Sequence, residues 1–170
     1  MPGHDEREAF RAFADPIQKV VSCVDLKVRL QQREFDNRNW LLTTGHEGLR
    51  LTDSLRLLFS FTVNTVEKSG ESAMTTLRYD YEIFRITQPE NPIFGWHWHP
   101  KSRRSKVNYP HLHVRSASEF PTKHLPTGRV SIEDVILFAF DELDVQPTHG
   151  DSRRIVTEIR DRHKLFRSWH

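Results

Sequence analysis

The sequence predicts an α+β fold: one antiparallel β-sheet of about five or six strands, with helices packed on one face and a polar, His- and Arg-rich opposite face. In the middle of the chain apolar and polar residues alternate with period two, whereas towards both ends apolar residues recur at three- and four-residue steps. The strand signals follow one another with turn-like connections, which favours antiparallel pairing. At 170 residues the chain suits a single domain, 1–170.

The first predicted element is a helix over residues 5–22. Its core-facing stripe consists of apolar residues at helical spacing: Phe10, Phe13, Ile17, Val20 and Val21. Within this region Asp15 precedes Pro16, the order found where a helix begins, so we expect a second short helix to begin there.

The sheet is predicted over 24–116. Its strand signals in chain order are CVDLKVRLQQ (23–32), SLRLLFSFTVNTV (54–66), TLRYDYEIFRI (76–86), PIFGWHWH (92–99) and HLHV (111–114), with a weaker one at NWLLT (39–43). In SLRLLFSFTVNTV, for example, Leu57, Phe59 and Phe61 occupy alternate positions. Such alternation is typical of strands with one covered face. The turn signal EKSGES (67–72) separates this strand from the next.

Two helices are predicted to complete the chain, at 131–143 and 152–168. Ser131 is a good N-cap residue, and Asp134 stands three residues later, where a capping box places its partner. The second helix is amphipathic: its apolar residues can dock it on the body of the protein, and its outer face is basic.

The most informative stretch is GWHWHPKSRRSKVNYPHLHV (95–114), which holds two His-x-His pairs on predicted strands. Side chains at i and i+2 of a strand share a face. Trp96 and Trp98 therefore point into the core, while the histidines point the other way. Four imidazoles are thus predicted on the open face: His97, His99, His111 and His113.

Strand pairing adds a geometric expectation for these rings. We expect a hairpin centred on Ser105, in which directly opposed Cβ atoms lie about 5 Å apart. It sets His99 opposite His111. It also sets His97 opposite His113, so the four rings would form a compact quadrilateral.

Basic residues surround the histidine pairs. Between residues 91 and 118 there is no Asp or Glu, so no acid within this segment offsets the positive charge. Such a patch attracts phosphate groups. The predicted nucleic-acid contacts are five cations and one ring that could stack on a base: Lys101, Arg103, Arg104, Lys106, Arg115 and Tyr109.

These groups favour a phosphoryl-transfer site with RNA as the substrate. Cleaving RNA requires a base for the 2′-hydroxyl, an acid for the leaving oxygen, and cations for the charge that develops on the phosphate. Two histidines can serve as base and acid because histidine exchanges protons near neutral pH. The four histidines are therefore the predicted catalytic residues of a ribonuclease that needs no metal or other cofactor. Which histidine is the acid and which is the base stays open.

Two other interpretations of the same face stay open. His-x-His pairs supply metal ligands, and Asp80 or Glu82 of a neighbouring strand could join them, but five nearby cations oppose a divalent ion. A non-enzymatic module could instead use the face to bind a nucleic acid or an acidic protein. His124 could fold back toward the patch from its loop, although a loop histidine is more often solvated.

The remaining features concern the compartment. Cys23 is the only cysteine, which excludes an internal disulfide and suits a reducing compartment. No apolar run approaches the ~20 residues that cross a bilayer. The first residues, MPGHDEREAF, lack the pattern of a signal peptide. We therefore expect a cytoplasmic protein with no membrane partner.

The segments RYDYEIF (78–84), FGWHWHP (94–100), YPHLHV (109–114) and GRVSIEDVI (128–136) follow one another in a layout that resembles the TumE-like toxins of prokaryotic toxin–antitoxin systems. The resemblance covers about residues 55–143. It implies a small α+β toxin that acts as a nuclease and is neutralised by a cognate antitoxin protein. It points to His99, His111 and His113 as the matching positions. GWHW stands where the family has Asp-Asn, and the terminal helices extend beyond the family's compact pattern.

Overall fold

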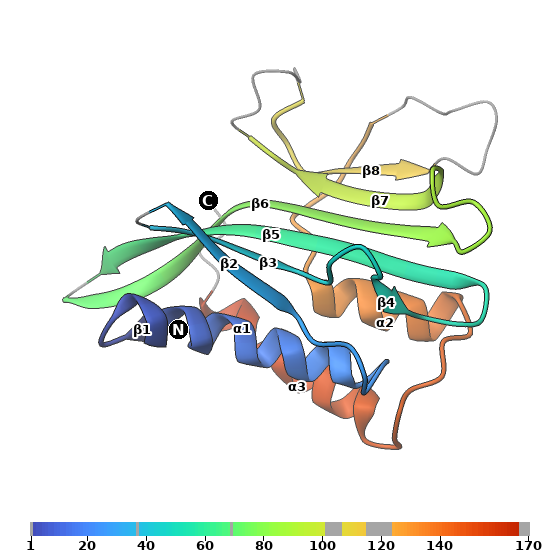
Figure 1. The fold of residues 1–170 in the computed structure, drawn as a ribbon, viewed down its shortest axis with the longest axis horizontal. Helices are drawn as coiled ribbons and strands as arrows, with labels where there is room; N and C mark the ends of the chain where they lie inside the picture. Colours follow the sequence, from blue (N-terminus) through green and yellow to red (C-terminus); the bar gives the residue numbers. More distant parts are fainter. Residues whose placement is uncertain (1, 37, 69, 101–106, 115–123, 167–170) are drawn as a thin grey trace.

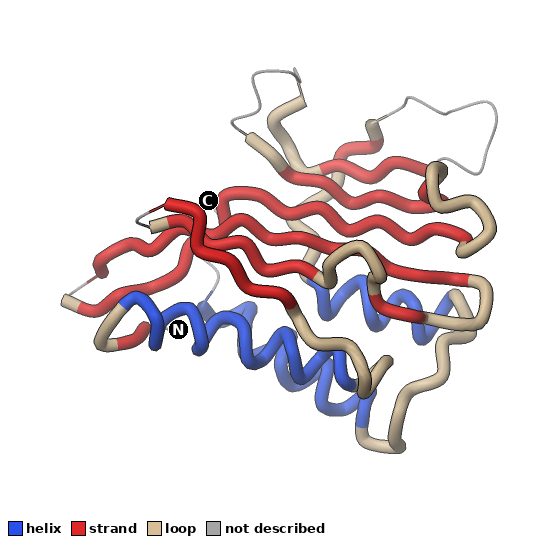
Figure 2. The backbone as a smooth tube through the Cα atoms, viewed as in Figure 1, coloured by secondary structure: helices blue, strands red, loops and turns tan. Residues whose placement is uncertain are grey.

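The computed structural model describes residues 2–36, 38–68, 70–100, 107–114 and 124–166. In these ranges three helices pack on one face of a single antiparallel sheet of nine strands (Figure 1), which confirms the predicted α+β fold with more strands than expected. Figure 2 shows the strands as one layer with the helices on one side of it. None of the described helices is both long enough and apolar enough to span a membrane.

Nearly all of the sheet is formed by the part of the chain between the first helix and the last two. In chain order the elements are β1 (Pro2–Gly3), α1 (Glu6–Ser22), β2 (Gln31–Asp36), β3 (Asn39–Thr43), β4 (Leu49–Arg50), β5 (Leu55–Lys68), β6 (Glu71–Arg85), β7 (Pro92–Trp98), β8 (His111–Val114), β9 (Leu125–Pro126), α2 (Ile132–Glu142) and α3 (Ser152–Phe166). The strand order is β2-β3-β5-β6-β7-β8-β9, while the short β1 pairs with β6 and β4 pairs with β5. Strands that follow one another in sequence are therefore mostly neighbours in the sheet.

Helix α1 runs without a break, so the second helix that we expected to begin at Asp15 is not formed. The N-cap of α1 is Asp5, whose carboxylate accepts a hydrogen bond from a backbone N–H in the first turn. Pro16 lies inside the helix, where it removes one backbone hydrogen bond. Apolar residues on both sides of it, including Phe10 and Val20, are buried in the core, and this continuous contact outweighs the lost bond.

The strand predicted from CVDLKVRLQQ is wrong in its first part, because residues 24–30 form an irregular connection. Backbone groups of this connection bond to a side chain of α1 instead of a neighbouring strand. Gln18 donates to the carbonyl of Val28 and accepts from the N–H of Leu30. Leu26, one of the alternating apolar residues of this strand signal, is 61% exposed. The local alternation is therefore outweighed by hydrogen bonds to α1.

The long hairpin of β5 and β6 forms the centre of the sheet, and its alternation follows the prediction. Its side chains on the helix-covered face are buried: Leu57, Phe59, Phe61, Val63, Tyr79, Tyr81 and Ile83. They form one core with apolar residues of all three helices. The alternate positions of β6, among them Asp80 and Glu82, therefore face away from the helices.

The last two helices begin close to the predicted residues. Ser131 caps α2: its hydroxyl accepts from the N–H of Asp134, whose carboxylate accepts from the N–H of Ser131. This capping box confirms the sequence prediction. Helix α3 is tied to α2 by His163, whose Nδ1 lies 2.6 Å from a carboxylate oxygen of the fully buried Glu133. The predicted end of this helix, at 168, lies outside the described residues.

Candidate functional site

The two His-x-His pairs lie at the neighbouring strands β7 and β8, as expected, but in a different register. His97 pairs with His111, and Gly95 pairs with His113. The predicted pairing of His97 with His113, and with it that of His99 with His111, is therefore wrong by two residues. A shift of two residues keeps every side chain on its own face. The prediction that all four histidines share one face is thus unaffected.

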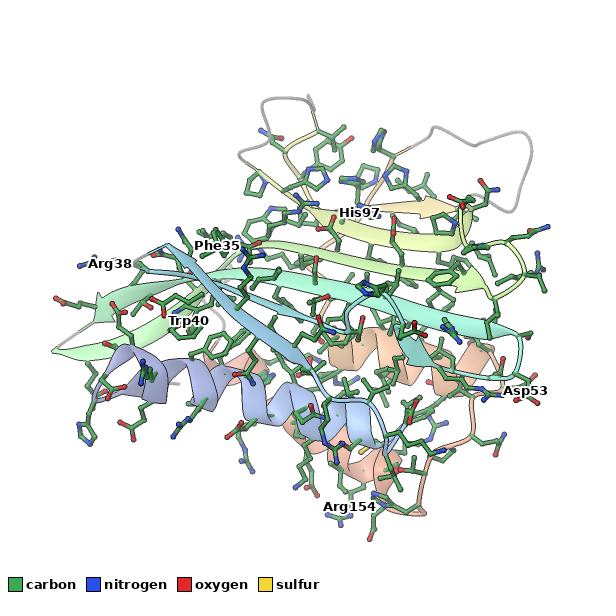
Figure 3. The ribbon with its side chains drawn as sticks, viewed as in Figure 1. Phe35, Arg38, Trp40, Asp53, His97 and Arg154 are labelled. Atoms are coloured by element: carbon green, nitrogen blue, oxygen red, sulfur yellow. The ribbon has the colours of Figure 1, made fainter. Side chains whose placement is uncertain are left out.

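The alternation along β7 is confirmed by the burial of its tryptophans. Trp96 and Trp98 are each 8% exposed and belong to the core. The ring of Trp96 packs edge-on against Phe138 of α2, with centroids 5.5 Å apart. The Arg129 guanidinium lies over Trp98, 3.7 Å from the ring centroid. His97, labelled in Figure 3, therefore lies on the opposite face, away from the helices.

Five imidazoles gather on this face instead of four. Neighbouring ring centroids lie between 4.5 and 6.1 Å apart. We call this group the histidine cluster, and its members are His97, His99, His111, His113 and His124. His124 directly precedes β9, whose pairing with β8 brings its ring to 4.5 Å from that of His113. The loop histidine that we expected to be solvated therefore folds back onto the site.

His111 lies deepest in the cluster and is only 1% exposed, so the expectation of an open position is wrong for this residue. The rings of Tyr109 and of the other cluster histidines surround it. Its Nδ1 lies 2.9 Å from the Tyr109 carbonyl oxygen, which assigns the proton to Nδ1 and the lone pair to Nε2. Burial lowers the pKa of His111, although this hydrogen bond opposes the change. His111 is therefore a neutral imidazole at pH 7.

The polar face of β6 brings carboxylates to the cluster. Asp80 pairs with His97 across the sheet, and its Oδ1 lies 3.2 Å from Nδ1 of His97. Its other oxygen lies 2.6 Å from Nε of Arg78. Burial raises the pKa of Asp80, but the hydrogen bonds from His97 and Arg78 outweigh burial and hold the pKa below its usual range. Glu82 lies on the other side of the ring, with Oε1 3.6 Å from Nε2 of His97.

Two ring nitrogens of the cluster are buried and have no hydrogen-bond partner among the described residues: Nε2 of His97 and Nδ1 of His99. The distance of 3.6 Å from His97 to Glu82 is too long for a hydrogen bond. Burial lowers the pKa of His99, and the charge of Asp80 only partly opposes this. Buried polar atoms without partners destabilise a fold, and they are typical of sites that bind a further group.

Gly95 provides the space in which the His97 ring lies. A Cβ atom at position 95 would lie 2.6 Å from Nε2 of His97, closer than any normal contact. Because the two residues are i and i+2 on one strand, the ring folds over the glycine backbone. The absence of a side chain at Gly95 therefore sets the position of Nε2.

No family model, no curated protein and no solved structure matches the chain.

Most of the predicted nucleic-acid contacts lie outside the described residues: Lys101, Arg103, Arg104, Lys106 and Arg115. Tyr109 is described and is 41% exposed, with its ring 6.1 Å from that of His111. It lies at the rim of the histidine cluster, where a base could stack on it. All six stay predictions.

The sequence offered Asp80, Glu82 and His124 only as possible additions to the site, and the structure brings all three to the histidine cluster. The two acids had a usable signal, because they share the polar face of their strand, but only the strand order places that strand beside β7. His124 carried no such signal. His124 reaches the site because the two residues that follow it, Leu125 and Pro126, pair with β8.

The basic outer face of α3 is a weaker candidate surface than its sequence indicates. Four of its cations form ion pairs, namely Arg153–Asp141, Arg154–Asp151, Arg154–Glu158, Arg160–Asp161 and Lys164–Asp161. Acids of α3 and of the segments next to it therefore offset much of the charge that would attract an acidic partner.

Proposed function

We propose that the histidine cluster is the active site of a ribonuclease and that the protein acts as a toxin by cleaving RNA. The observation that carries this proposal is geometric: five imidazoles gather in one cluster, and the Asp80 carboxylate is hydrogen-bonded to one of them. Burial lowers the pKa of His99 and of His111, so both can accept a proton at neutral pH. Asp80 is the ionised carboxylate, and His97 is its partner.

In the proposed reaction one imidazole removes the proton of the 2′-hydroxyl. His99 suits this role, because its pKa is lowered and its side chain is only partly buried. The 2′-oxygen bonds to phosphorus, the bond from phosphorus to the 5′-oxygen breaks, and the 5′-oxygen takes a proton from a second group. The exposed His124 at the edge of the cluster can supply that proton. The products are a 2′,3′-cyclic phosphate and a 5′-hydroxyl.

Two further features support RNA as the substrate. The acid-free segment between residues 91 and 118 supplies cations that can hold phosphates, and the exposed ring of Tyr109 can stack on an unpaired base. The resemblance to TumE-like toxins supports the same activity and adds a partner, a cognate antitoxin that neutralises the protein.

The chemistry of the cleaved ends tests the proposal. The wild-type protein should cleave a single-stranded RNA oligonucleotide and leave 2′,3′-cyclic phosphate ends, which mass spectrometry identifies. The same oligonucleotide with a 2′-deoxynucleotide at the cleaved position should resist, because it lacks the attacking oxygen. Equal cleavage of both oligonucleotides would contradict the mechanism. Binding of RNA without cleavage would instead favour the non-enzymatic module.

The basic segment should determine the salt dependence of RNA binding. Replacing both Arg103 and Arg104 by alanine should weaken binding and reduce the slope of log K against log salt by about 1.4, since each phosphate contact on a single strand contributes about 0.7. Replacing Arg153 and Arg154, two ion-paired arginines of α3, is the matched control and should leave the slope unchanged. Filter binding at several salt concentrations measures both, and an unaltered slope in the first variant would reject its role.

A further inference from the structure

We infer that the histidine cluster holds a divalent metal ion of the zinc type, ligated by His97, His111 and His113. This inference deepens the proposed function and rests on it for what the ion does to RNA. Binding of the ion itself is argued from the three rings and the groups that contact them, and it can be tested without RNA.

The three rings are close enough to share one ion. Their nitrogens lie within 4.8 Å of one another. Ligands of tetrahedral zinc lie at 2.0–2.1 Å, which sets them about 3.4 Å apart. The rings would therefore approach one another by about 1.4 Å at most on binding, which small side-chain rotations supply. They come from adjacent positions of two paired strands, so the backbone already fixes their relative placement.

The hydrogen bonds of two of the rings are those of metal-binding histidines. Such a histidine usually donates its second ring N–H to a carboxylate or a backbone carbonyl, which orients the other nitrogen toward the ion. His97 faces the Asp80 carboxylate with Nδ1, and His111 faces the Tyr109 carbonyl with Nδ1. In both rings Nε2 is left with its lone pair.

An independent observation concerns the nitrogen that would bind. Nε2 of His97 is buried, and it has no hydrogen-bond partner in the ranges that the structure describes. Its position is set by Gly95, whose partner on β8 is His113. Nε2 of His97 therefore lies over Gly95, the residue that pairs with the third ligand, His113. An ion at this point would satisfy it.

The charges of the described residues agree with a cation. Asp80 Oδ1 lies 3.2 Å from Nδ1 of His97 and Glu82 Oε1 lies 3.6 Å from its Nε2, so two carboxylates border the site. Arg78 is the cation beside them, and its charge is offset by the ion pair with Asp80. The five basic residues that oppose a metal in the sequence lie outside the described residues: Lys101, Arg103, Arg104, Lys106 and Arg115.

A second possible ligand group, Asp80, His97 and His99, shares one ring with the first. It would use the carboxylate that already pairs with Arg78, and it would leave Nε2 of the deeply buried His111 unused. The group with His111 and His113 keeps both existing hydrogen bonds. We therefore assign the ion to that group.

Three histidine ligands leave one position of a tetrahedral zinc ion for water or a substrate oxygen. At this position the ion would draw negative charge from a phosphate oxygen of RNA while His99, which is not a ligand, takes the 2′-hydroxyl proton. The bonds that form and break in the RNA are the same with the ion as in the proposed reaction.

Metal binding by the untagged full-length chain, without RNA, tests the inference. After treatment with a chelator and dialysis, the protein should bind about one Zn²⁺ per chain in isothermal titration calorimetry, and Co²⁺ should give the visible absorption of a tetrahedral site. His113→Ala and His113→Gln should each weaken zinc binding at least tenfold, whereas His99→Ala should not. Asp80→Asn should weaken it by about 10–100-fold, the range found when the partner of a ligating histidine is removed.

Two glycine variants provide a matched pair. Gly95→Ala should weaken zinc binding at least tenfold, because the added Cβ displaces Nε2 of His97, while Gly128→Ala should not, because no atom lies within 4 Å of a Cβ built there. Circular dichroism of each variant confirms its fold. Absence of saturable zinc binding in the wild type would overturn the inference. So would loss of binding in His99→Ala together with retention in His113→Ala.

The outcome is separable from that of the proposed function. If the protein cleaves RNA at the full rate after chelation and binds no zinc, the proposed ribonuclease activity stands and the metal site is rejected. If the protein binds zinc through His113 and cleaves no RNA, the metal site stands and the proposed ribonuclease activity is rejected.

Discussion

Replacing both His99 and His113 by alanine should lower RNA cleavage by about 10²–10⁴-fold, the range that one proton-transfer group supplies, while the protein stays folded. The two side chains stand on the open face and are only partly buried, so their loss opens no cavity in the core. His111 is less suitable for this experiment because it is almost completely buried and its removal would disturb the packing of five neighbouring rings.

The control for this variant is the replacement of two exposed histidines outside the cluster, His46 and His149. That variant should cleave RNA at the wild-type rate. Initial rates on a fluorescent RNA oligonucleotide measure activity, and circular dichroism with urea unfolding measures the fold. Wild-type activity in the folded His99→Ala, His113→Ala variant would remove the histidine cluster from the reaction.

Replacing Trp96 by alanine should lower the free energy of unfolding by about 3–5 kcal/mol, the usual effect of removing a large aromatic side chain from a core. The ring is 8% exposed and lies between Phe94 and Phe138, with centroids 5.9 and 5.5 Å away. It joins the sheet to α2, so its loss leaves a cavity between the two layers.

Urea unfolding followed by circular dichroism measures this change. Phe35→Ala is the matched control, because that ring is 50% exposed on β2 and its loss should change stability by less than about 0.5 kcal/mol. RNA affinity per folded molecule should be the same in Trp96→Ala as in the wild type. A stable Trp96→Ala variant with weakened RNA binding would mean that the ring stacks on bases and not on the core.

Much of the fold could be predicted from the sequence because it depends on periodicity. The alternation of β5 and β6 and the Ser131 cap are local patterns, and tertiary contacts reinforce them. Residues 24–30 carry an equally regular alternation, yet Gln18 of α1 takes up their backbone groups. No local pattern reports that competition, since it depends on where α1 ends.

The candidate site was predictable to the same extent. The shared face of the histidines follows from the two-residue repeat, which a shift of two does not change. Their pairing does not follow from it, because registers two residues apart satisfy the same pattern. The approach of Asp80 and His124 requires knowledge of which strands are neighbours, and here β6 and β9 flank the β7–β8 pair.

The order of elements along the chain has a consequence during synthesis. The strands β2 to β9 all precede α2 and α3. On the ribosome the sheet can therefore assemble by pairing of successive strands while α1 alone is present to cover its apolar face. At 5–20 residues per second, the stretch from Ile132 to Phe166 takes roughly 2–7 s to complete. In the first part of that interval, until α2 has been made, Trp96 lacks its partner Phe138, which makes this the period of greatest demand for a chaperone.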